Sequence, residues 1–129
     1  MDKSTILTGF NDHLMEMLED LKTALPSNTV IATAYPGLYA IRKANPKMII
    51  QVWKPYVVDK YEEEIMKGNI NFFLEKDYKE DVVDAANSNT ILEKIDSIKG
   101  PIKDLSEENL QKTISYIQNL VKLCKVYYT

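Results

Sequence analysis

Apolar side chains recur at steps of three and four residues over the first part of the chain. The set is Ile6, Phe10, Leu14, Met17, Leu18, Leu21 and Leu25. This spacing places them all on one side of an α-helix, because a helix turns once in about 3.6 residues. Asp2 or Ser4 is suited to cap the start of this helix, and Pro26 is expected to end it. Four acids fall on the opposite face: Asp12, Glu16, Glu19 and Asp20.

The same spacing predicts a second helix over about residues 30–44. Pro36 conflicts with a continuous helix there, because an interior proline removes a backbone hydrogen bond. We therefore expect a short first turn that ends near Ala34 and a shorter helix that begins at Pro36. Asn45 and Pro46 then predict a new start, with the asparagine as N-cap and the proline in the first helical position.

The helix after Pro46 is expected to reach Gly68, with a kink or a restart at Pro55. The remaining predicted segments are residues 69–75, 77–86, about 90–98 before a stop at Gly100–Pro101, and a last helix from the cap Ser106 to Tyr127. No stretch alternates apolar and polar residues between hairpin turns, so no strand is predicted. The sequence therefore predicts an all-α fold, an irregular multi-helix bundle of about five to seven helices in a single domain over residues 1–129.

Length and composition agree with one globular domain. The chain has 129 residues, enough to bury a core, and its hydrophobic content of 45% is ordinary. No apolar run approaches the roughly 18 residues that span a bilayer, and the N-terminus lacks a signal-peptide pattern. The single cysteine, Cys124, has no partner for an internal disulfide. We therefore expect an intracellular protein without a membrane span.

Charge is divided into blocks along the chain. Residues 1–20 hold five acids and one lysine, and residues 21–58 hold five basic residues and no acid. Residues 59–96 hold eleven acids and five lysines, and residues 97–129 hold five lysines and three acids. Either the folded surface is bipolar, which favours oriented packing against a partner protein or a second copy, or the blocks interleave on folding.

The stretch Ala40–Tyr56 is the densest apolar run, and it holds the only arginine and the only tryptophan. We interpret it as the central helix of the domain and as its contact surface. The candidate interaction residues are Arg42, Lys43, Lys47, Lys54, Trp53 and Tyr56. Such a mixture of basic and aromatic groups binds phosphates and stacks bases, so weak nucleic-acid binding is one alternative. Core packing is the other role open to Trp53, because it follows Ile49 and Val52 on the apolar side.

Groups that carry catalysis are scarce. His13 is the only histidine, and a carboxylate metal site needs more than His13 and Glu16. Cys124 falls on the apolar face of the last helix, where a thiol behaves as a small hydrophobe. The acids Asp77, Asp81 and Asp84 lack the rhythm of a calcium loop, and no phosphate-binding or nucleophile motif is present. We therefore expect no enzyme, no metal and no cofactor.

Several short segments together carry a resemblance to a known family. They are Ala40 to Lys47 (AIRKANPK) followed by Trp53, then Gly68 to Phe73, Lys76 to Tyr78, and Tyr116 to Leu120. In these segments the chain resembles a family of small uncharacterised helical proteins encoded by large DNA viruses of algae and protists. The segment Tyr35–Pro36–Gly37 departs from that pattern and puts the length of the second helix in question.

The resemblance implies a virus-encoded protein and no catalytic residues. Fifteen lysines against one arginine, with many Ile, Asn and Tyr, agree with an A/T-rich coding genome. The function expected from the resemblance is a non-enzymatic structural or interaction protein, a minor component of the virus particle that is also present in the host cytoplasm during infection. The alternative is a virus-encoded regulatory or host-interaction factor.

Overall fold

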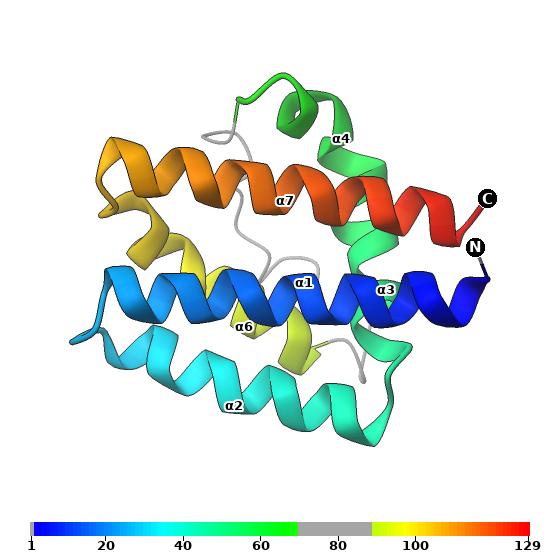
Figure 1. Ribbon diagram of the computed structural model, residues 1–129, viewed down its shortest axis with the longest axis horizontal. Helices are drawn as coiled ribbons and strands as arrows, with labels where there is room; N and C mark the ends of the chain where they lie inside the picture. Colours follow the sequence, from blue (N-terminus) through cyan, green and yellow to red (C-terminus); the bar gives the residue numbers. More distant parts are fainter. Residues whose placement is uncertain (1, 70–88) are drawn as a thin grey trace.

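The structure is a computed structural model that describes residues 2–69 and 89–129 (Figure 1). The described residues form helices and no strand, so the predicted all-α fold is confirmed there. In chain order the helices are α1 (Lys3–Ala24), α2 (Thr29–Ala44), α3 (Met48–Trp53), the π-helix η1 (Lys54–Val58), α4 (Asp59–Met66), α6 (Asn89–Lys103) and α7 (Glu107–Tyr127). The predicted segments 69–75 and 77–86 lie outside the described residues, apart from Asn69. The expected single domain stays a prediction.

α1 is the central element of the bundle. It lies between α7 and α2 in one layer, with α6 and the α3–α4 segment behind that layer (Figure 1). Its predicted stripe is buried from Ile6 to Leu21, and residues on this stripe contact α2, α3 and α7. The carboxylate of Asp2 caps the helix by accepting a hydrogen bond from the Thr5 backbone N–H at 2.8 Å.

The stretch Ala40–Tyr56 is not one central helix, so that prediction is wrong. It contains the end of α2, a turn, α3 and the start of η1. Asn45 is the C-cap of α2, and its backbone N–H donates to the Ile41 carbonyl at 2.9 Å. The Asn45 side chain accepts from the Lys47 N–H at 3.2 Å, which is the geometry of an Asx turn. Asn45 and Pro46 therefore form a turn between helices, not an N-cap and a first helical residue.

α2 continues through Pro36, so the predicted break near Ala34 is also wrong. Asn28 caps the helix by accepting from the Ile31 N–H at 3.1 Å. The proline leaves the Ala32 carbonyl without its usual donor, but both residues are exposed and water can reach that carbonyl. Buried residues on both sides of Pro36 hold the helix together, since Ile31, Ala34 and Leu38 all face the core.

α3, η1 and α4 follow one another without a break. Pro55 has no N–H to donate, and the helix widens there into a π turn in which Asp59 N–H bonds to the Lys54 carbonyl. The predicted end at Gly68 is confirmed. Gly68 has a φ of 83°, and the N–H groups of Gly68 and Asn69 donate to the carbonyls of Ile65 and Glu64 at 3.0 and 2.9 Å. These are the two bonds of a Schellman motif.

α6 passes through the predicted stop at Gly100–Pro101 and ends at Lys103. Ile98 and Ile102 lie one turn apart on either side of this pair, and both are buried. Burial of such a side chain is worth about 1.5–3 kcal/mol, which offsets the local cost of the proline. α7 begins as predicted, because the Ser106 hydroxyl accepts from the Asn109 N–H at 3.3 Å.

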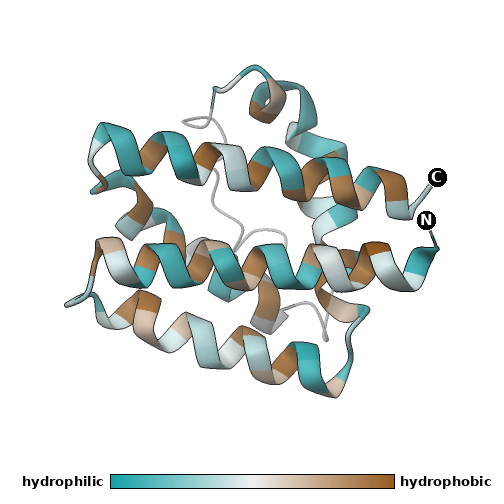
Figure 2. Ribbon diagram, in the orientation of Figure 1, coloured by the Kyte–Doolittle hydropathy of each residue, from teal (hydrophilic) through white to brown (hydrophobic). Residues whose placement is uncertain are grey.

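The core joins side chains from all of these helices. Figure 2 shows hydrophilic and hydrophobic residues alternating along the long helices, as expected when each helix has one buried side. Phe10 of α1 meets Trp53 of α3 edge to face, with ring centroids 6.0 Å apart. None of the helices in residues 2–69 and 89–129 is long and apolar enough to cross a membrane.

Candidate functional site

The aromatic members of the predicted interaction set belong to the core. Trp53 is only 2% exposed, so of the two roles left open by the sequence it takes core packing. Tyr56 is half-buried against the same core, and its ring lies 5.4 Å from the Lys60 amine. Trp53 is therefore not exposed for stacking on a base, and the interaction role of Tyr56 stays a prediction.

Two of the basic members, which come from a block of the sequence without acids, pair with acids of the neighbouring blocks. Arg42 donates to the Asp12 carboxylate at 2.5 Å, and Lys54 pairs with Asp59. Lys43 and Lys47 are exposed, and in the described part of the chain neither has an ion-pair partner. The set is therefore split between the core, two ion pairs and two separate surface lysines.

Ion pairs between helices show that the charge blocks interleave. Arg42 joins the basic block to an acid of the first block, and Lys125 of the last block pairs with Glu62 of the third. Both pairs are at the surface, where each is worth about 0–1 kcal/mol and serves mainly to cancel charge. The sequence left a bipolar and an interleaved surface open, and these pairs favour the interleaved one.

Three acids of α1, Glu16, Glu19 and Asp20, have no lysine or arginine partner in the described part of the chain. Glu16 and Glu19 are exposed, and no lysine or arginine in residues 2–69 and 89–129 pairs with either. They border a groove of about 540 Å³ between α1 and α2, which we call the acidic groove. Its lining is Asp12, Met15, Glu16, Glu19, Tyr35, Tyr39 and Arg42. The Lys22 amine is held 4.7 Å from the Tyr35 ring, and Tyr39 is 48% exposed.

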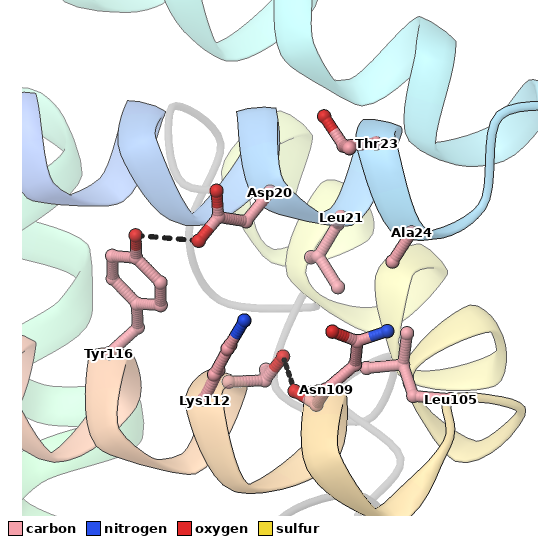
Figure 3. A pocket seen from close by; sticks show the side chains of 9 residues that line it. Asp20, Leu21, Thr23, Ala24, Leu105, Asn109, Lys112 and Tyr116 are labelled. Carbon is pink, nitrogen blue, oxygen red and sulfur yellow. Dashed lines mark hydrogen bonds between the residues drawn. The ribbon is translucent and has the colours of Figure 1, made fainter.

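A second concavity, the α1–α7 pocket, lies between the end of α1 and the start of α7 (Figure 3). Its volume is about 410 Å³. Its polar side chains are Asp20 and Thr23 from α1 and Asn109, Lys112, Thr113 and Tyr116 from α7. Leu21, Ala24 and Leu105 complete it. This pocket was not predicted from the sequence, because Asp20 and Tyr116 are 96 residues apart and no local pattern joins them.

Tyr116 and Asp20 fix one wall of the α1–α7 pocket. The Tyr116 hydroxyl donates to Asp20 Oδ2 at 2.7 Å. This bond to the Asp20 carboxylate raises the pKa of Tyr116 to about 12, with smaller contributions from burial and from the negative charges of Asp20 and Glu16. On its other side the Tyr116 ring lies 4.7 Å from the His13 ring. Tyr116 is therefore held as a neutral donor up to high pH.

His13 and Cys124, the two side chains considered for catalysis, lie in different surroundings. His13 Nδ1 is 3.6 Å from Glu16, while its Nε2 is buried without a hydrogen-bond partner among the described residues. Burial raises the pKa of the Cys124 thiol to about 12, so the thiol stays neutral, and its Sγ lies 3.9 Å from the Ile50 carbonyl oxygen. No group of three metal-ligating side chains occurs in the described ranges. Asp77, Asp81 and Asp84 lie outside them.

No protein-family model, curated protein or solved structure matches this chain. The resemblance to the viral family, and the location and function that it implies, therefore stay predictions.

The Tyr116–Asp20 bond gives a pH-dependent stability that can be measured. Tyr116→Phe should lower the free energy of unfolding by about 1 kcal/mol at neutral pH, because a hydrogen bond to a carboxylate is lost. The folded-state pKa of about 12 is above the ordinary value of 10.0, so this stability is fully present below pH 10.0 and is lost as pH rises toward about 12. Urea unfolding of both proteins at increasing pH should show the difference between them shrinking over that interval. A difference that stays constant would contradict the bond.

Proposed function

We propose that this chain is a non-enzymatic interaction protein that binds a basic segment of a partner protein in the acidic groove. The observation that carries the proposal is the pair Glu16 and Glu19, exposed on the central helix and left without a lysine or arginine partner in the described residues. His13 Nδ1 lies 3.6 Å from Glu16. By contrast, Asp12 is paired with Arg42, and Glu62 is paired with Lys125. Lysine or arginine side chains of a partner would supply the missing charge.

The walls of the groove suit a protein partner. Tyr39 is exposed beside the two glutamates, and tyrosine contributes contact area at interfaces with little loss of conformational entropy. Met15, which is otherwise buried, adds an apolar group to the lining. A nucleic acid fits this face poorly, because its phosphates would meet Glu16 and Glu19 and because Trp53 is buried.

The non-enzymatic part of the proposal rests on chemistry. The one thiol, Cys124, is buried and neutral, and a neutral thiol is a poor nucleophile. His13 has one carboxylate beside it and a tyrosine ring against its face, with no nucleophile within the contacts described. The sequence also allowed the chain to bind a second copy of itself. The binding experiment below distinguishes this from binding to a different protein.

From the sequence resemblance we propose a more specific role, in which the protein is a minor component of a large DNA virus particle. Mass spectrometry of purified particles and of infected cells tests it. The chain should be enriched in particles that have been treated with protease to remove surface contaminants. Its presence in infected cells together with its absence from such particles would favour the alternative, a regulatory or host-interaction factor.

The acidic groove is tested with a synthetic helical peptide that carries lysine and arginine at every third or fourth position. Replacing both acids, Glu16→Gln and Glu19→Gln, should weaken binding by about tenfold or more, since two charge pairs are lost. The matched control replaces the exposed pair Glu107 and Glu108 by glutamine, which changes net charge equally but lies outside the groove. Isothermal titration calorimetry at low and moderate salt measures the dissociation constant of the peptide for each double variant.

Equal weakening of peptide binding in the two double variants would mean that binding depends on net charge alone. It would contradict the acidic groove as the binding site. Failure of the peptide to bind at low salt would do the same. Binding of the chain to itself, seen as a concentration-dependent sedimentation coefficient that Glu16→Gln with Glu19→Gln abolishes, would identify a second copy as the partner and contradict the proposed basic segment of a different protein.

A further inference from the structure

We infer that the α1–α7 pocket binds a small zwitterion, an α-amino acid with an apolar side chain. The Asp20 carboxylate would receive the ammonium group of the ligand, and the Lys112 ammonium would receive its carboxylate (Figure 3). This site is separate from the acidic groove, and the inference does not depend on the proposed function.

The two charges stand on opposite walls and do not neutralise each other. Asp20 comes from α1 and Lys112 from α7. No ion pair joins them, and Lys112 has no hydrogen-bond or ion-pair partner in the described residues. Lys54 and Lys125 each reach a carboxylate, whereas Lys112, like Lys43 and Lys47, does not. A ligand with one positive and one negative end would satisfy both walls at once, which a simple anion or cation would not.

Asp20 is already oriented for a second contact. Tyr116 donates to its Oδ2, which fixes the carboxylate against the α7 wall. Its Oδ1 receives no hydrogen bond from any side chain in the described part of the chain, so a carboxylate lone pair is left for a donor from the ligand. Tyr116 is thus a positioning residue for Asp20.

The other polar groups add to the carboxylate end. Asn109 lies one helical turn before Lys112, and the Asn109 side-chain amide faces the pocket (Figure 3). The Thr113 hydroxyl donates to the Asn109 carbonyl at 3.0 Å, so its proton is already used within α7. An amide N–H beside an ammonium group is a suitable pair of donors for a ligand carboxylate.

The size and floor of the pocket limit the rest of the ligand. A volume of about 410 Å³ is near the lower end of ordinary ligand sites, which span roughly 300–1,000 Å³. Leu21, Ala24 and Leu105 supply apolar surface between the charged walls. An aliphatic side chain of the size of leucine would cover this surface, whereas a charged side chain would be desolvated there.

The site is formed before any ligand binds. α1 and α7 pack along their lengths through buried residues such as Leu21 and Ile117. The pocket walls are therefore on two helices held by the core, and ligand binding does not require a segment to fold.

The experiment compares three probes of nearly equal shape. L-leucine carries both charges, 4-methylpentanoate lacks the ammonium group, and 3-methylbutylamine lacks the carboxylate. Titration of the ¹⁵N-labelled full chain by two-dimensional NMR should show L-leucine shifting amides of residues 20–24 and 109–116. Its dissociation constant should be about tenfold or more below that of either analogue, since each analogue leaves one charged wall unpaired.

Lys112→Met is the decisive variant, because it removes the charge and keeps an unbranched side chain on an exposed helix position. It should weaken L-leucine binding at least about tenfold and make L-leucine bind no better than 3-methylbutylamine. Lys122→Met is the matched control, since Lys122 is exposed on the same helix and outside the pocket. Asp20→Asn should abolish the advantage of L-leucine over 4-methylpentanoate.

Each other outcome overturns the inference. No shift with L-leucine at millimolar concentration, or shifts spread over the surface, would show that no site exists. Equal loss from Lys112→Met and Lys122→Met would show a non-specific charge effect. Equal binding of L-leucine and 4-methylpentanoate would show an anion site instead of a site for a zwitterion.

Discussion

Burial of the apolar stripe of α1 is the interaction on which the rest of the structure depends. This one helix touches α2, α3 and α7, so its stripe supplies one side of three separate helix contacts. Phe10 and Leu18 are fully buried on it, and Phe10 fixes the position of Trp53 through an edge-to-face contact. Truncation of a buried aromatic side chain costs about 3–5 kcal/mol in other proteins. That is a large part of the stability of a small domain.

The sequence predicted the fold class and most helix starts, and these depend on local chemistry. The caps at Asp2 and Ser106 and the stop at Gly68 all form within a few residues of chain. Two of the errors, at Pro36 and Pro101, have one cause. At Pro36 and Pro101 a local signal favoured a break, but buried residues on both sides carry the helix through. Tertiary packing is decided by residues distant in sequence, which a local signal does not contain.

The candidate sites were less predictable than the fold. The acids Glu16 and Glu19 were placed correctly on the outer face of the first helix, but whether an acid is neutralised depends on cations from other helices. Arg42, expected to be an interaction residue, pairs with Asp12. The α1–α7 pocket needs Asp20 beside Tyr116 and opposite Lys112, an arrangement that exists only after α1 and α7 have packed. Charge pairing between helices thus decides which side chains are left for a ligand or partner.

Native-state hydrogen exchange tests the central role of α1 most directly. If the α1 stripe holds the other helices, amides in the middle of α1, from Phe10 to Leu21, exchange only through global unfolding. Their opening free energies should equal the free energy of unfolding measured with denaturant. Amides of α2 around Pro36 should exchange faster, through local opening. The account is contradicted if the α1 amides open at a lower free energy than those of α2, because α1 would then detach while the rest of the bundle stayed folded.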